Sequence, residues 1–289
     1  MTAASSGAKG APTLRAAAVQ MCSTPNVADN LEAAAQLIES AAAAGATLIA
    51  LPENFAILGA RETDKVGVME TDGSGPIQDF LAAAARRHRC TLIGGTVPLR
   101  SRDPQRIRAA CLVYGPDGQR LARYDKMHLF DVELRDRDEV YRESATIEPG
   151  DELVVADTPA GRIGLAVCYD LRFPELFRQL GERGVDLLAV PAAFTESTGR
   201  AHWEVLLRAR AIENLCYVIA PAQVGEHASG RRTHGHAMII NPWGEVLGEL
   251  QGDGPGVATA LVDNARCGAL RSSFPALEHR RLTGGPGPA

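Results

Sequence analysis

Residues 162–176 read Arg162-Ile-Gly-Leu-Ala-Val-Cys168-Tyr-Asp-Leu-Arg-Phe-Pro174-Glu-Leu. An apolar run typical of a buried strand leads directly into Cys168, and Pro174 can begin a helix six residues later. A strand, a sharp turn and a helix in this order match the layout of a nucleophile elbow, which presents one side chain at the edge of a sheet. Cys168 is therefore a candidate nucleophile, and a buried structural cysteine is the alternative.

Two further ionisable residues follow predicted strands. Glu53 comes after the apolar run 47–51, and Lys126 comes shortly after the run 119–124. A nucleophilic thiol needs a base or a cation nearby, because the thiolate is the reactive form. A desolvated carboxylate at a strand end suits a general base, and an ammonium beside a thiol lowers the thiol pKa. An ion-paired or helix-capping carboxylate and a solvated amine are the alternatives for these two positions.

Three motifs occur in order along the chain, and they read Leu51-Pro-Glu53-Asn, Tyr124-Asp-Lys126-Met-His-Leu and Gly164-Leu-Ala-Val-Cys168-Tyr-Asp-Leu-Arg-Phe-Pro-Glu. The ordered set resembles the motifs of the nitrilase (carbon–nitrogen hydrolase) superfamily, and the match extends over roughly residues 13–280. The resemblance implies an α/β fold, an α-β-β-α sandwich with mixed sheets. It also implies that Glu53 is the general base, that Lys126 stabilises the oxyanion and that Cys168 is the nucleophile.

The family also has a second glutamate in the loop after the lysine. The best match is Glu143, in Tyr141-Arg-Glu143-Ser-Ala-Thr, and Glu133 lies nearer to Lys126 in the sequence and is the alternative. In the implied reaction the thiolate attacks an amide carbonyl and forms an acyl thioester, which water then hydrolyses. Lys126 and the backbone N–H of Tyr169 hold the oxyanion, and Glu143 orients the water. No metal or organic cofactor is required.

Three residues are candidates for binding the substrate. Arg172 lies four residues past Cys168, where a guanidinium can pair with a substrate carboxylate, and a structural ion pair with Glu175 is the alternative. Phe194 and Thr195 come at another predicted strand end, and we expect them to line the same pocket. Ordinary packing is the alternative for both.

Further stretches are similar to the Nit-type amidases of this superfamily, namely His128-Leu-Phe-Asp131-Val, Ser144-Ala-Thr-Ile-Glu-Pro-Gly150 and Ala201-His-Trp203-Glu-Val-Leu-Leu-Arg-Ala-Arg210-Ala-Ile-Glu213. The stretch with Trp203 most resembles members that act on deaminated glutathione. The resemblance thus implies a cysteine-dependent amidohydrolase that releases α-ketoglutarate and cysteinylglycine. The alternatives are an ω-amidase acting on α-ketoglutaramate, another small-amide or N-carbamoyl hydrolase, and a non-catalytic interaction module. The intact glutamate, lysine and cysteine argue against the last.

The composition agrees with a globular protein. Of 289 residues, 45% are hydrophobic and 22% charged, which argues against a disordered chain. A net charge of −5 argues against a nucleic-acid partner, and no apolar stretch reaches the ~18 residues of a membrane span. The six cysteines lie at least 21 residues apart, a pattern typical of reduced thiols in an intracellular protein. We expect a cytoplasmic location, and the acid-poor first 20 residues leave an organelle open.

The pattern of elements predicts a mixed sheet. Strands alternate with helices in the first third, where Asn30 is a candidate cap for the helix 30–44. Later features are hairpins at 109–124 and 237–250, a long loop and a further helix. We expect one domain over residues 13–282 between flexible tails at 1–12 and 283–289. The family resemblance implies a homodimer or a higher homo-oligomer that acts on a small-molecule amide.

The detailed expectations for these elements are a helix at 76–88, a strand at 90–97, a loop at 127–150, a helix at 201–213 and a strand at 216–223.

Two other features of the sequence have ordinary interpretations. His234 and His236 share a face if they lie on a strand, but no third residue has the spacing of a metal ligand. A Cys–His hydrolase that pairs Cys168 with His236 is a rival mechanism. Arg231 and Arg232 stand in a Gly/Ser/His-rich stretch that predicts a solvated turn.

Overall fold

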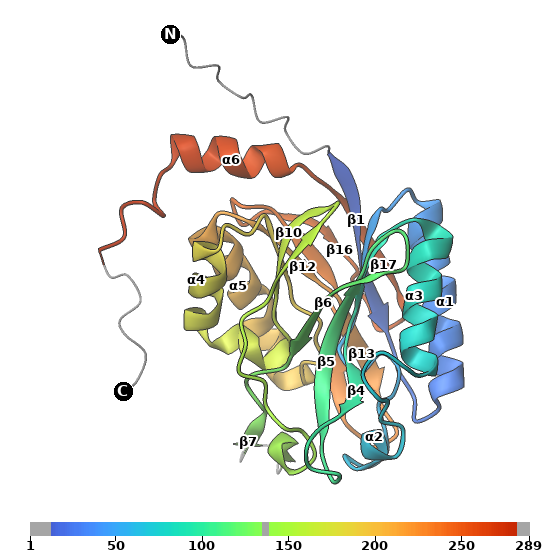
Figure 1. Ribbon diagram of the computed structural model, residues 1–289. Coiled ribbons are helices and arrows are strands. Elements are labelled where there is room, and N and C mark those ends of the chain that lie inside the picture. Colours follow the sequence, from blue (N-terminus) through green and yellow to red (C-terminus); the bar gives the residue numbers. More distant parts are fainter. Residues whose placement is uncertain (1–12, 135–138, 282–289) are drawn as a thin grey trace.

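Two β-sheets pack face to face, and helices cover the outer face of each (Figure 1). The computed structural model describes residues 13–134 and 139–281. Within them, a nine-stranded sheet has the order β14-β13-β1-β2-β3-β5-β4, with β17 paired to β1 and β6 paired to β5. A six-stranded sheet has the order β16-β15-β12-β11-β10-β9. Helices α1 and α3 pack on the first sheet and α4 and α5 on the second. The predicted α-β-β-α sandwich is confirmed.

The helices of the described residues include two short 3-10 turns, η2 and η3. Their bounds are α1 Val27–Ala43, α2 Asp64–Gly67, α3 Pro76–His88, η2 Glu143–Ala145, η3 Cys168–Arg172, α4 Pro174–Glu182, α5 Glu196–Asn214 and α6 Asn264–Ser273.

The strands of the nine-stranded sheet are β1 Leu14–Met21, β2 Leu48–Leu51, β3 Thr91–Gly94, β4 Val97–Arg100, β5 Ile107–Tyr114, β6 Arg120–Asp125, β13 Ala222–Glu226, β14 Arg232–His234 and β17 Gly256–Val262. The strands of the six-stranded sheet are β9 Val155–Thr158, β10 Gly161–Leu165, β11 Leu187–Ala189, β12 Tyr217–Ala220, β15 Met238–Ile240 and β16 Val246–Glu249. A separate hairpin consists of β7 Asp131–Leu134 and β8 Glu139–Arg142.

Both sheets are mixed. Strands β1, β2 and β3 run parallel, whereas β17 is antiparallel to β1. In the second sheet β10, β11 and β12 run parallel, and β9 and β15 are antiparallel to their neighbours. The central parallel strands are covered on both faces, so β2 and β12 are buried at every position and their sequences are continuously apolar. One large apolar core fills the space between the sheets, and a second lies between the first sheet and its helices.

The first helix begins earlier than expected. Its cap is Asn26, whose side chain accepts hydrogen bonds from the Ala28 and Asp29 amides, and not Asn30. Asn30 is buried within the helix and donates to the Thr24 and Ala56 carbonyls. The prediction was wrong because asparagine can either cap a helix or, when buried, hydrogen-bond to the carbonyls of a neighbouring loop.

Other differences arise where the chain turns inside an apolar run. The run 90–97 is divided between two strands, because Gly95 adopts a φ of 55° and bends the chain between β3 and β4, which both run antiparallel to β5. Pro221 divides the run 216–223 into β12 and β13. Helix α5 begins at Glu196 rather than at 201, because Thr195 caps it. The loop predicted at 127–150 contains the hairpin β7–β8 and the turn η2. The hairpins β5–β6 and β15–β16 and the helix α3 are as predicted.

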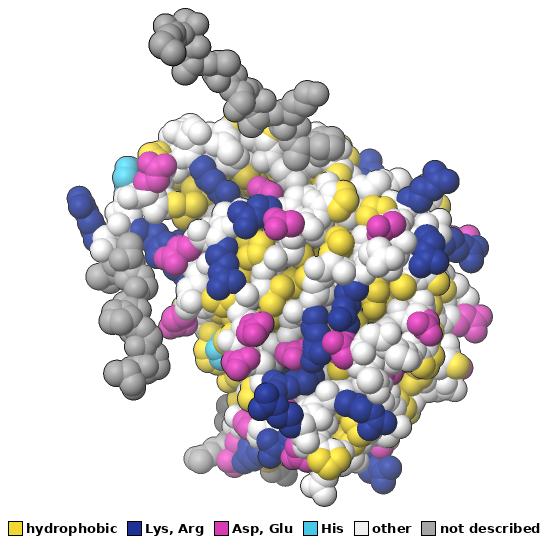
Figure 2. All heavy atoms as spheres, viewed as in Figure 1, with side chains coloured by type: hydrophobic (Ala, Val, Ile, Leu, Met, Phe, Trp, Pro, Cys, Tyr) yellow, Lys and Arg dark blue, Asp and Glu magenta, His cyan; other side chains and the backbone are white. Residues whose placement is uncertain are grey.

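The domain limits at 13 and 282 stay predictions, and the tails 1–12 and 283–289 lie outside the described residues. On the face shown in Figure 2, Lys and Arg side chains lie interspersed with Asp and Glu. In the described part of the chain, no helix has both the length and the apolar character needed to cross a membrane.

Candidate active site

Cys168 lies at the point where the second sheet ends and η3 begins. Its φ of 50° is in the left-handed region, which is rare for a side chain other than glycine. The backbone therefore turns sharply between β10 and α4, as the strand–turn–helix sequence predicted. Cys168 is 7% exposed and lines a cavity together with other polar and aromatic side chains. Cys168 is thus held in a fixed position at the edge of the six-stranded sheet.

Glu53 and Lys126 reach the same cavity from the nine-stranded sheet. Glu53 follows β2, and Lys126 follows β6. The Lys126 ammonium lies 2.7 Å from Glu53 Oε1, and Glu53 Oε2 accepts a hydrogen bond of 2.9 Å from the Ala193 amide. Both side chains are almost completely buried. The three predicted residues therefore meet between the sheets, although 115 residues of sequence separate Glu53 from Cys168.

Glu143 completes this cluster of charges. Each of its carboxylate oxygens is 2.8 Å from Lys126 Nζ, and Oε2 also accepts a hydrogen bond of 2.7 Å from the Phe130 amide. Glu133 lies in β7, outside the set of residues that line the cavity. The structure thus brings Glu143, rather than Glu133, to the lysine.

The environment fixes the protonation states. Burial raises the pKa of the Cys168 thiol well above its usual value, and the Glu53 charge raises it further. Lys126 lowers the thiol pKa as expected, but burial and Glu53 outweigh it. Burial opposes the charge of Lys126, yet Glu143 and Glu53 raise the lysine pKa well above its ordinary value. The resting site therefore holds a neutral Cys168 thiol beside the Lys126 ammonium and the ionised Glu143 carboxylate. A base must then take the thiol proton before the sulfur can attack.

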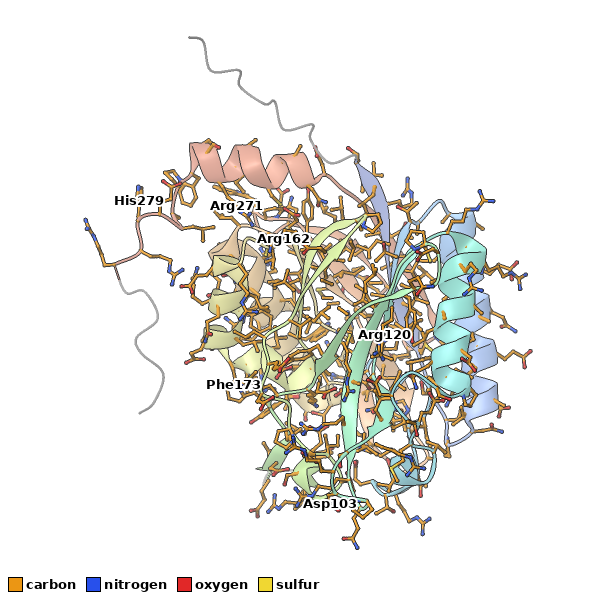
Figure 3. All side chains as sticks on the ribbon, viewed as in Figure 1. Asp103, Arg120, Arg162, Phe173, Arg271 and His279 are labelled. Carbon is orange, nitrogen blue, oxygen red and sulfur yellow. The ribbon has the colours of Figure 1, made fainter. Side chains whose placement is uncertain are left out.

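Tyr169, the candidate oxyanion donor, lines the cavity as the second residue of η3. The first N–H groups of a helical turn have no acceptor within that turn and point away from it, as an oxyanion donor requires. Its ring packs edge-on against Phe130 and Phe173, with centroids 5.0 and 5.3 Å apart. Phe173, labelled in Figure 3, also stacks on His128 at 3.7 Å. These rings hold the turn in place.

Arg172, Phe194 and Thr195 all line the cavity. Arg172 has no ion pair with Glu175; among the described residues its polar contact is the His202 ring, 3.1 Å away. Its guanidinium also lies 5.2 Å from the Phe194 ring. Phe194 and Thr195 have structural roles as well, because Phe194 packs on a tryptophan of α5 and Thr195 caps that helix. Phe194 and Thr195 therefore lie in the wall of the cavity and also take part in packing and helix capping.

Sequence reasoning missed Asp170. This fully buried carboxylate accepts hydrogen bonds from the Tyr124 hydroxyl (2.7 Å), the Val167 amide (2.8 Å) and the His128 amide (2.9 Å), and it contacts His128 Nδ1 at 2.7 Å. Tyr124 and His128 flank Lys126 in the sequence, so Asp170 fixes the lysine strand against the nucleophile turn. The available signal was an acidic residue two positions after a candidate nucleophile in an otherwise apolar stretch.

Sequence reasoning also misjudged Arg231. It lines the cavity and donates a hydrogen bond to the Ala193 carbonyl, whereas its neighbour Arg232 is exposed and ion-paired as expected of a solvated turn. Nothing in the local sequence distinguishes the two arginines, because the inward direction of Arg231 is set by the pairing of β13 with β14.

His234 and His236 are not among the described residues that line the cavity. The His234 and His236 rings stack 4.4 Å apart, and His236 Nδ1 contacts Glu249 at 2.6 Å. No histidine is among the described residues that line the cavity, so His236 is not placed to serve Cys168. Across residues 13–134 and 139–281, no three His, Cys, Asp or Glu side chains form a group that could hold a metal ion.

Comparisons with known proteins agree with this geometry. The sequence model of the family described as carbon-nitrogen hydrolase matches residues 15–272. The chain is 48% identical over 269 residues to a deaminated glutathione amidase from Synechocystis, covering 92% of this chain and 97% of that protein. It is 43% identical to a deaminated glutathione amidase from Yersinia enterocolitica, covering 92% of each.

A solved structure has the same fold. The NitFhit protein of C. elegans superposes with a TM-score of 0.87 at 37% identity, covering 94% of this chain and 66% of the other. The predicted membership of the nitrilase superfamily and its Nit-type branch is confirmed. With a match that extends over nearly all of its described residues, this chain belongs to the carbon–nitrogen hydrolase family.

Proposed function

We propose that the chain hydrolyses amide bonds with Cys168 as nucleophile, Glu53 as general base and Lys126 as the cation that stabilises the oxyanion. The observation that carries this proposal is the meeting of the three groups in one buried cavity. Because the thiol pKa is raised, the thiol is neutral at rest and Glu53 takes its proton as sulfur attacks the carbonyl carbon. The C=O electron pair moves to oxygen, where Lys126 and the Tyr169 N–H stabilise the negative charge.

The rest of the cycle uses the same groups. The tetrahedral intermediate collapses, the C–N bond breaks and Glu53 gives its proton to the departing amine. The acyl group remains on sulfur as a thioester. Glu53 then takes a proton from water that Glu143 orients, the water oxygen bonds to the acyl carbon and the C–S bond breaks. Glu53 returns its proton to the departing sulfur, which restores the thiol, and a carboxylic acid leaves.

The substrate we propose is deaminated glutathione, cleaved to α-ketoglutarate and cysteinylglycine. This rests on the names of the relatives, at 48 and 43% identity over 92% of this chain. Arg172 supports it, because a guanidinium without an acidic partner among the described residues suits an α-keto-acid carboxylate. Phe194 and Thr195 line the cavity beside it.

The test is release of α-ketoglutarate by the purified protein from deaminated glutathione and from α-ketoglutaramate, measured side by side. We expect kcat/KM to favour deaminated glutathione by about 10²-fold or more, a difference of about 2.7 kcal/mol in transition-state binding. A preference for α-ketoglutaramate would instead make the chain an ω-amidase with the same mechanism. Absence of turnover of both would overturn the substrate and call for a panel of other amides and N-carbamoyl compounds.

Variants test the mechanism. Cys168→Ala should abolish turnover, whereas the matched change Cys22→Ala at an exposed thiol should leave it intact. Full activity in both Glu53→Gln and Lys126→Met would refute the triad. A protein that binds no amide and turns over none would fit an interaction module.

We also propose that the chain forms a homodimer. Support comes from an exposed apolar surface where Ile212 of α5 lies beside the turn at Gly244, and where Trp243 packs edge-on against Phe274, 5.8 Å away. Large exposed apolar side chains in one area are typical of association sites. Light scattering coupled to size exclusion should give twice the mass of one chain, and a monomer at micromolar concentration would refute the proposal.

We propose a cytoplasmic location. All six cysteines are free thiols, five of them buried, which suits a reducing compartment. A fluorescent fusion to the full chain should distribute through the cytoplasm, and its concentration in an organelle would contradict this.

A further inference from the structure

Three aromatic rings form a continuous row in the cavity. Phe130 is in the middle, with its centroid 4.9 Å from that of Tyr141 and 5.0 Å from that of Tyr169. A guanidinium lies over each outer ring. That of Arg231 is 5.4 Å from the Tyr141 centroid, and that of Arg172 is 5.9 Å from the Tyr169 centroid. The row therefore separates two positive charges, one near each end.

Both of these guanidiniums lack an ion-pair partner within the described part of the chain. Their polar contacts are to groups that carry no negative charge, the His202 ring for Arg172 and the Ala193 carbonyl and the Tyr141 ring for Arg231. Arg231 Nε is buried and has no hydrogen-bond partner among the residues that the structure describes. A buried donor of a charged group without an acceptor costs free energy, and a ligand that supplies an acceptor would recover it.

The other cationic side chains of the cavity differ in this respect. Arg61 pairs with Asp64 at 3.1 Å, Lys65 pairs with Glu62 at 2.6 Å, and Lys126 pairs with Glu53 and Glu143. Arg142 differs in another way, because its side chain is exposed to solvent and donates to the Tyr141 carbonyl. Glu62 is the carboxylate whose charge interacts with that of Arg231, but it is committed to Lys65. Arg172 and Arg231 are therefore the two partly buried cations of the cavity that have no ion pair among the described residues, and a bound anion could pair with them.

The surroundings of Arg231 indicate which part of a substrate it faces. The Ala193 carbonyl accepts a hydrogen bond from Arg231, and the amide of the same residue donates to Glu53 Oε2 at 2.9 Å. Glu53 is the group that passes a proton to the departing amine, so Arg231 lies on the side of the amine. Arg172 instead lies on the short turn that begins with Cys168, beside the acyl group.

We propose that the cavity recognises an amide with a carboxylate on each side of the scissile bond, and that Arg231 binds the carboxylate of the departing amine. This rests on the proposed function, because it assumes amide cleavage at Cys168. Deaminated glutathione has this chemistry, with an α-keto-acid carboxylate on the acyl side and a glycine carboxylate on the amine side. α-Ketoglutaramate has the first carboxylate alone. Arg231 is then the residue that separates the two substrates.

The experiment compares three substrates. They are deaminated glutathione, the same compound with its glycine carboxylate converted to a primary amide, and α-ketoglutaramate. We expect Arg231→Gln to lower kcat/KM for the first by about 10- to 100-fold, the usual effect of losing a hydrogen bond to a charged group. The amide-capped compound and α-ketoglutaramate should change by less than about threefold in the same variant, because they carry no carboxylate for Arg231 to bind.

Two matched variants complete the set. Arg231→Lys keeps the charge but loses the planar fork, so it should recover part of the activity. Arg232→Gln removes the adjacent arginine, which is exposed and pairs with Glu196 at 2.8 Å, and it should leave all three rates unchanged. Equal losses of kcat/KM for all three substrates in Arg231→Gln would mean that the arginine only supports Ala193 and Glu53, and would overturn the proposal.

Binding to the Cys168→Ala protein separates this inference from the proposed function. Calorimetry should give weaker binding for the amide-capped compound than for deaminated glutathione, and Arg231→Gln should remove the difference. If this difference in binding is found but the unmodified protein does not cleave deaminated glutathione, the proposed substrate is overturned and the role of Arg231 in binding a carboxylate is supported. Equal affinities for the two compounds would overturn the inference whatever the rates, and failure of both to bind would overturn both proposals.

Discussion

The Tyr124 hydroxyl donates a hydrogen bond of 2.7 Å to the buried Asp170 carboxylate, and this bond joins β6 of the nine-stranded sheet to the turn η3. Tyr124 lies in β6, two residues before Lys126, and Asp170 lies two residues after Cys168. The bond therefore sets the position of the cation relative to the nucleophile. Asp170 is a positioning residue, since it acts through the elements that carry the reacting groups.

Replacement of Asp170 by Asn should impair both stability and rate. The carboxylate accepts three hydrogen bonds, and an amide would replace one of its two oxygens by an NH₂ group that faces a donor, so we expect a loss of about 1–3 kcal/mol in the free energy of unfolding. Urea denaturation measures this change. Tyr124→Phe removes one of these donors and should lower kcat with little change in KM. An unchanged kcat in a folded Tyr124→Phe protein would show that the bond has no positioning role.

Glu143→Gln should separate the two halves of the reaction. If Glu143 orients the hydrolytic water, the variant still forms the thioester but hydrolyses it slowly, and kcat falls by about 10²-fold. Mass spectrometry after mixing with substrate should detect the acyl-enzyme, with a burst of amine product. Glu53→Gln should give no acyl-enzyme, because the thiol keeps its proton. Glu148→Gln, at a carboxylate paired with Arg108, is the control that should behave as the unmodified protein.

The stability should fall in mild acid because of His234. Burial, together with the His236 and Arg200 charges, lowers the pKa of His234 from 6.5 to about 4. Between these values the unfolded chain binds a proton that the folded chain does not, so the free energy of unfolding decreases as the pH falls from about 6.5 to about 4. Urea midpoints across this range should show a shallower decline in His234→Gln. The exposed His279, labelled in Figure 3, offers a control change, and equal slopes in all proteins would contradict the prediction.

Gly95→Ala should displace the general base. Gly95 has a φ of 55°, and a Cβ there would overlap the carbonyl oxygen of Pro52, which directly precedes Glu53. We expect a loss of about 1–3 kcal/mol in stability from backbone strain, with a fall in kcat. Gly268→Ala in α6 is the matched control, since a Cβ there meets no atom within 4 Å. Activity that survives in a folded Gly95→Ala protein would show that the turn does not position Glu53.

The proposed catalytic residues could be located in the sequence because each follows a strand in a short motif. Glu53, Lys126 and Cys168 are each preceded by a run of residues whose pattern identifies a strand, and strand ends determine where a side chain is presented. Asp170 and Arg231 were not predictable in the same way. Their roles depend on partners distant in the sequence, such as Tyr124 for Asp170, and local pattern contains no information about those contacts.

The fold was predictable to the level of its layers for a similar reason. Hairpins such as β5–β6 carry Gly and Pro in their turns and were identified correctly, whereas the division at Gly95 was missed because apolar residues continue on both sides of it. Asn30 shows the other limit. A polar residue near a helix start satisfies the cap rule whether it caps the helix or ties down a neighbouring loop.

The location of the cluster between two sheets has a consequence for how the enzyme responds to stress. Glu53 and Lys126 follow strands of the nine-stranded sheet, and Cys168 follows a strand of the six-stranded one. Their contact therefore depends on the apolar core between the sheets and not on either sheet alone. Mild denaturant or pressure that loosens the packing between the two sheets separates the base from the sulfur, while the strands keep their own hydrogen bonds. Inactivation then precedes the loss of the far-ultraviolet circular dichroism signal. Catalytic activity therefore reports a loss of packing between the two sheets before the secondary structure changes.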